Sequence, residues 1–116
     1  MTENRIRKLC LSFPGATEEI LWGGVLVFKV AGKMFLCMAT EPPYNYSFKC
    51  PENAFLELTE LPGIKPAPYL ARAHWIQIDP TECILAAKQL EKLIRQSYDL
   101  VVAKLPGKTQ KMLMER

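Results

Sequence analysis

Two lysines flank the turn of an apolar hairpin in residues 27–35, which read VFKVAGKMF. A two-residue loop would need a positive φ at Ala31, which is costly. The sequence therefore predicts a three-residue loop, in which Gly32 takes the left-handed conformation of a G1 bulge. In that register Lys29 lies directly opposite Lys33. Like charges at opposed positions cost roughly a few tenths of a kcal/mol, so we interpret the pair as a feature kept for an anionic partner.

The same register divides the hairpin into a core face and an outer face. Leu26, Phe28, Met34, Leu36 and Met38 are predicted to face the core, and Phe35 to share the outer face with the lysines. Alternation in the segments YNYSFKC (44–50) and HWIQID (74–79) adds Lys49 and Trp75 to the outer face. Cations with aromatic rings suit phosphate contact and base stacking, each stacked base being worth about 1–3 kcal/mol. The alternative is a solvated face on which Trp75 lies half-buried under the 63–70 loop.

The surrounding pattern predicts the elements that position these side chains. It predicts helices at 2–12, from Pro51 to Pro62-Gly63, and from an N-cap at Asp79 to about Lys104, and strands at 17–22, 25–30, 33–39, 44–50 and 74–79. This order, α-β-β-β-β-α-β-α, is an α+β fold: an antiparallel sheet of about five strands with helices on one face. We expect one domain over residues 1–116, with a tail at 107–116 that frays.

Composition narrows the classes of function. The net charge of +3 is mild for a dedicated nucleic-acid domain. The four cysteines form no Cys-x-x-Cys pair and His74 is the single histidine, so we expect no metal and no cofactor. No apolar signal segment or membrane-length run is present, so we expect a cytoplasmic protein with no membrane contact. No catalytic motif is found, and we expect a protein that is not an enzyme.

Four segments together resemble the small bacterial YjbR/MmcQ-like family. They are FPGATEEILWG (13–23), FKVAGKMF (28–35), PGIKPAPYLARAHWIQID (62–79) and LIRQSYDLVVAKLP (93–106). The resemblance covers about residues 5–106, and it implies a CyaY-like (frataxin-like) fold and a double-wing DNA-binding protein. The positions that carry over are Lys29, Lys33, Lys49, Tyr69, Arg72, His74 and Trp75. Frataxins have an acidic first helix, whereas Arg5, Arg7 and Lys8 make this one basic, which argues against iron binding.

Two hypotheses of function follow. In the first, the protein is a non-catalytic module, a monomer or weak homodimer, that binds DNA or another polyanion through the open sheet face. Its nucleic-acid or anion-binding residues are then Lys29, Lys33, Lys49, Arg72, Trp75 and Phe35. In the second, the same face, the 63–70 loop and Trp22 bind a protein or a small anionic ligand.

Overall fold

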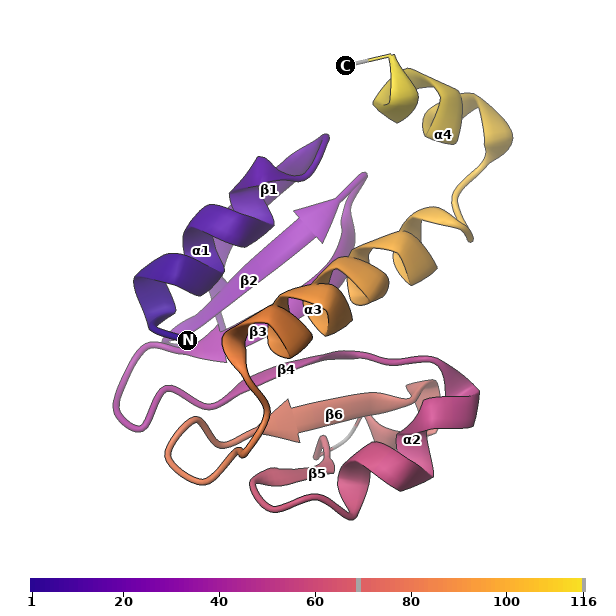
Figure 1. The fold of residues 1–116 in the computed structure, drawn as a ribbon. Helices are drawn as coiled ribbons and strands as arrows, with labels where there is room; N and C mark the ends of the chain where they lie inside the picture. The colour runs from indigo at the N-terminus through magenta and orange to yellow at the C-terminus, as the bar shows by residue number, and fades with distance from the viewer. Residues whose placement is uncertain (69, 116) are drawn as a thin grey trace.

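The structure is a computed structural model that describes residues 1–68 and 70–115, with the side chain of Arg72 outside the description. The elements along the chain are α1 (Glu3–Ser12), β1 (Ala16–Leu21), β2 (Val25–Val30), β3 (Lys33–Ala39), β4 (Tyr46–Lys49), α2 (Glu52–Thr59), β5 (Ile64–Pro66), the 3-10 helix η1 (Ala71–Ala73), β6 (Trp75–Ile78), α3 (Ala87–Val102) and α4 (Gly107–Met114). Within the described residues six strands form one open antiparallel sheet, ordered β1-β2-β3-β4-β6-β5 (Figure 1). The predicted α+β class is confirmed.

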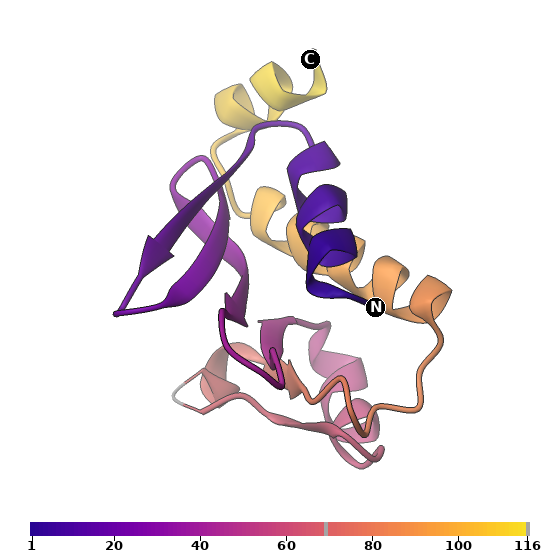
Figure 2. The same ribbon diagram turned by 90° about the vertical axis from the view of Figure 1, so that its left-hand side faces the viewer.

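One face of the sheet is covered by helices, as Figure 2 shows for α1 and α3. Side chains alternate between the two faces along each strand, so every second side chain points toward the helices and is buried against them. The core on this face includes Phe28, Leu36, Phe48, Ile76 and Ile94 of α3, none of which is exposed. We call the opposite surface the free face; it carries the partly exposed Cys37 and Gln77 and the buried Val27 and Ser47.

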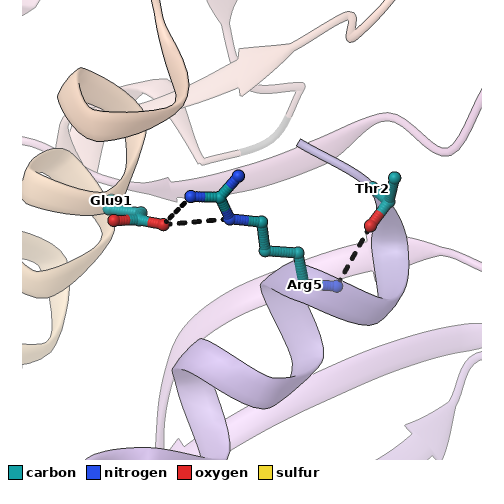
Figure 3. A network of polar contacts seen from close by, with 3 residues as sticks. All are labelled: Thr2, Arg5 and Glu91. Atoms are coloured by element: carbon teal, nitrogen blue, oxygen red, sulfur yellow. Dashed lines mark hydrogen bonds and ion pairs between the residues drawn. The ribbon is translucent and has the colours of Figure 1, made fainter.

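A polar contact joins the two helices of this layer (Figure 3). The Arg5 guanidinium donates from Nε and Nη2 to Glu91 Oε1, at 3.1 and 2.7 Å. Thr2 caps the start of α1, since its Oγ1 accepts the Arg5 backbone N–H at 3.2 Å. Both charged side chains are partly exposed, so the ion pair contributes at most about 1 kcal/mol and orients α1 against α3 more than it stabilises them.

The third helix starts later than the sequence predicts. Asp79 does not cap it; the Asp79 carboxylate accepts the Thr81 N–H at 2.9 Å and the Thr81 hydroxyl at 2.6 Å, which closes a local turn. The helix α3 begins at Ala87, and the Ala86 N–H donates to Gln89 Oε1 at 2.9 Å. The predicted start was wrong because an aspartate caps a turn as readily as a helix.

Two further segments differ from the predicted elements. The strand β5 lies inside the predicted 63–70 loop, where Ile64 pairs with Ile78 at the edge of the sheet. The tail that was expected to fray forms α4. The side chain of its Leu113 is 9% exposed and packs against Gly15, which lies between α1 and β1. Tertiary burial of single apolar side chains stabilises both segments, which are too short to be stable alone. No helix in 1–68 or 70–115 has the length and apolarity to cross a membrane.

Candidate functional site

The β2–β3 hairpin has a different register from the predicted one. Val30 pairs with Lys33, so the loop has two residues, and Ala31 and Gly32 have φ values of 50° and 78°. The extra residue lies instead in β3, where the register shifts and Phe35 forms a bulge. A positive φ at alanine costs about 1–2 kcal/mol. Full burial of a phenylalanine is worth about 1.5–3 kcal/mol, and the bulge buries both Phe35 and Leu36 completely.

This register separates the two hairpin lysines. Lys29 pairs with Met34 and Lys33 with Val30, so the lysines point to opposite faces, and their predicted juxtaposition was wrong. Met34 also moves from the predicted core face to the free face. Lys29 Nζ lies 2.5 Å from Glu19 Oε1 on the neighbouring strand β1, which offsets its charge. Lys33 is exposed at the hairpin tip.

The two aromatic rings predicted to stack on bases are buried. Phe35 is 0% exposed and packs against Phe13 and Tyr98, with ring centroids 5.9 and 5.4 Å away. Trp75 is on the free face but 5% exposed. Its backbone is bonded to the preceding loop, because its N–H donates to Leu70 O and its carbonyl accepts the Ala67 N–H. Neither ring is accessible for base stacking, and the predicted stacking role was wrong.

The other predicted residues that the structure describes lie in different parts of the fold. Lys49 ends β4, opposite Trp75. The side chain of Arg72 lies outside the described residues, as does Tyr69. His74 packs edge-on against Phe55, with 5.5 Å between ring centroids. Trp22 is 69% exposed in the β1–β2 turn. Among the described residues no three histidine, cysteine, aspartate or glutamate side chains come together as a metal site.

Lys49 is brought beside Lys104, which follows the end of α3. The two side chains are close enough for their charges to interact. Burial lowers the pKa of Lys49, and the neighbouring Lys104 ammonium lowers it further. Within the described part of the chain neither lysine forms an ion pair with a carboxylate. Two adjacent, unpaired ammonium groups repel each other, and one anion bound between them would relieve that repulsion.

A buried hydroxyl fixes the end of β4 where Lys49 lies. Ser97 of α3 is 0% exposed, and its Oγ donates to Phe35 O at 2.6 Å. The same oxygen accepts the Lys49 backbone N–H at 3.0 Å. Ser97 therefore replaces a direct β3–β4 hydrogen bond that the Phe35 bulge opens. Ser97 and Lys104 were not predicted from the sequence, because only the crossing of α3 over the sheet brings them to Lys49.

The free face is polar at its centre. One cross-strand row passes through all six strands, namely Glu19, Val27, Cys37, Ser47, Gln77 and Lys65. Burial raises the pKa of the Cys37 thiol to about 11, and hydrogen bonds from Ser47 offset part of that effect. A raised pKa keeps Cys37 a protonated thiol at neutral pH, which is a poor nucleophile.

Taken with its fold, this arrangement defines the class as a small open-sheet α+β domain. The YjbR family model matches residues 11–100, and the chain belongs to the YjbR family. A similar curated protein is the uncharacterized protein YbdF of Escherichia coli O157:H7. It is 35% identical over 88 residues, which are 73% of this chain and 70% of that protein.

Two solved structures have similar folds. The crystal structure of Deinococcus radiodurans protein DR2400, with domain DUF419, is 28% identical, with a TM-score of 0.82 over 97% of this chain and 87% of that one. A protein from Pseudomonas syringae gives a TM-score of 0.73 at 20% identity, over 86% of this chain and 98% of that one, and shows the fold alone.

Proposed function

We propose that this protein is a non-catalytic binding protein for polyanions, with nucleic acid as the expected partner. The observation that carries the proposal is the adjacent pair Lys49 and Lys104, which has no carboxylate partner within the described residues. The expected partner is the one that the resemblance to double-wing DNA-binding proteins implies. The proposed contact lies at the end of the sheet where α3 finishes, whereas the sequence predicts it on the sheet face.

The chemistry favours backbone contact over sequence readout. Lysine binds phosphate as a point charge, and such contacts carry little information about base identity. Further lysines, Lys108 and Lys111, follow Lys104 on α4. With Phe35 and Trp75 buried, binding rests on charge and should be strongly salt-dependent.

A salt titration with fluorescent duplex and single-stranded DNA tests this function. The K49Q/K104Q variant should weaken binding and reduce the slope of log K against log salt by about 2, that is about 1 for each lost phosphate contact. The matched control K65Q/K88Q removes the same charge from β5 and α3. The proposal is rejected if the control weakens binding equally, or if wild type does not bind at low salt.

A small anion is the alternative occupant of the same lysine pair. Its binding would be measured with inorganic phosphate by calorimetry. Saturable phosphate binding that K49Q/K104Q abolishes, together with no measurable DNA binding, would assign the pair to a small ligand.

A further inference from the structure

A polar cavity opens at the other end of the free face. Its volume is about 260 Å³, and its lining comprises Asn45, Gly63, Ile64, Lys65, Gln77, Asp79 and Glu82. A second hollow of about 410 Å³ adjoins it, and the two share Asn45 and Gln77. The volumes suit a small organic molecule, and the site is distinct from the Lys49–Lys104 pair.

The wall of this cavity is built by close backbone packing. Gly63 has a φ of +79°, and a Cβ added there would overlap the Cys83 backbone nitrogen and lie 2.7 Å from its Cα. The Asp79 N–H donates to Gly63 O at 2.8 Å, and the Cys83 N–H donates to Asp79 O at 2.9 Å. These contacts fix the 79–83 turn against β5, so the cavity exists before a ligand arrives.

One polar atom at this cavity lacks a partner. Asn45 Oδ1 is buried and accepts no hydrogen bond in the described structure. An unsatisfied buried acceptor costs about 1–3 kcal/mol. Asn45 lines the cavity, and the terminal torsion of an asparagine is soft. A small rotation would therefore present Oδ1 to a donor in the cavity.

The charges around the cavity favour a positive donor. Asp79 and Glu82 line it and Glu41 lines the adjoining hollow, against the single ammonium of Lys65. Hydrogen bonds from Thr81 lower the pKa of the Asp79 carboxyl, so this group is ionised at neutral pH. Carboxylates and an amide oxygen are all hydrogen-bond acceptors.

We propose that this cavity binds a small organic cation that carries an ammonium or guanidinium group. The N–H donors of the cation would contact Asn45 Oδ1 and the carboxylates of Asp79 and Glu82. The proposal is independent of DNA binding at the opposite end.

Titration of the whole protein with agmatine, followed by amide chemical shifts in nuclear magnetic resonance, tests the site. Agmatine should saturate and shift the amides of Asn45, Gln77 and Asp79. Glutarate, an anion of similar length, should leave them unchanged. Equal binding of glutarate would overturn the proposal. The absence of saturation by about 10 mM agmatine would also overturn it, because the binding free energy would then be weaker than about −3 kcal/mol.

Variants then assign the contacts. E82Q and N45A should each weaken agmatine about tenfold, as the loss of one charge-assisted hydrogen bond predicts. N45D keeps an acceptor of the same shape and should bind at least as tightly as wild type. E57Q, on the exposed surface of α2, is the matched control. An N45D variant that binds as weakly as N45A, or an E57Q variant that weakens binding equally, would contradict the assignment.

Discussion

The two faces of the sheet share one backbone and differ in what their side chains meet. Under the helices, Leu36 and Phe48 pair across β3 and β4 and are fully buried. On the free face, the neighbouring pair Cys37 and Ser47 is polar and borders an open hollow. The helix-covered face therefore provides stability, and the free face is where the chain can place polar groups at low cost. Four comparisons of variants test this division, from the largest expected effect to the smallest.

Truncation of one residue on each face is the strongest test. Phe48→Ala should lower the free energy of unfolding by about 3–5 kcal/mol, because it leaves a cavity in the core. Ser47→Ala, one residue away on the free face, should cost only about 0.5–1.5 kcal/mol, the value of a single hydrogen bond. Urea denaturation measures both. Similar losses for the two variants would mean that the free face is as important to stability as the core.

The wall of the free-face cavity can be tested with two glycines of nearly equal φ. Gly32 and Gly63 have φ values of +78° and +79°, but only Gly63 has atoms where a Cβ would lie. Gly32→Ala should cost about 1–2 kcal/mol from the backbone alone. Gly63→Ala should cost about 1–3 kcal/mol more, since the 79–83 turn must shift. Denaturation midpoints compare them; equal losses would show that the turn does not pack on Gly63 as described.

The hydroxyl that joins the helix layer to the sheet should matter less than the core. Ser97→Ala leaves Phe35 O and the Lys49 N–H without their shared partner, with an expected loss of about 1–3 kcal/mol. Ser12→Ala, whose hydroxyl donates to Leu9 O on the exposed end of α1, should change stability by about 0.5 kcal/mol or less. An unchanged free energy of unfolding in Ser97→Ala would indicate that β3 and β4 close the bulge without this hydroxyl.

The smallest effect is a pH dependence that differs between the faces. Cys10 belongs to α1, and burial in the core under this helix raises its pKa from 9.0 to about 12. The folded state therefore holds its proton more tightly than the unfolded state. This contribution is complete below pH 9 and is lost as pH rises toward the folded pKa, by at most about 1.4 kcal/mol per pH unit.

The measurement compares Cys10→Ala with wild type, because lysines and tyrosines titrate in the same range. Between pH 9 and 10 the stability difference between wild type and Cys10→Ala should shrink. Cys37→Ala should show the same trend over a narrower window, since the Cys37 pKa reaches only about 11 on the free face. A difference that stays constant with pH would contradict the assigned burial of Cys10.

Much of the architecture follows from local sequence. Alternation correctly placed Tyr46 and Phe48 on one side of β4 and Ile76 and Ile78 on the same side of β6, because one buried face imposes a period of two. The Pro51 start of α2 and the end of α3 near Lys104 were also close to the observed bounds, whereas the start of α3 was not. These signals depend on neighbours along the chain, which a sequence contains.

The register of the hairpin and the candidate sites required the tertiary structure. A three-residue loop and a bulged β3 have similar local costs, and burial of Phe35 under α3 decides between them. Lys104 reaches Lys49, and the 79–83 turn reaches Gly63, only because distant segments pack together. The sequence alone therefore determined the α+β class and the two-sided sheet. Long-range burial decided which charged and polar groups meet, since its free energy exceeds the small differences between local conformations.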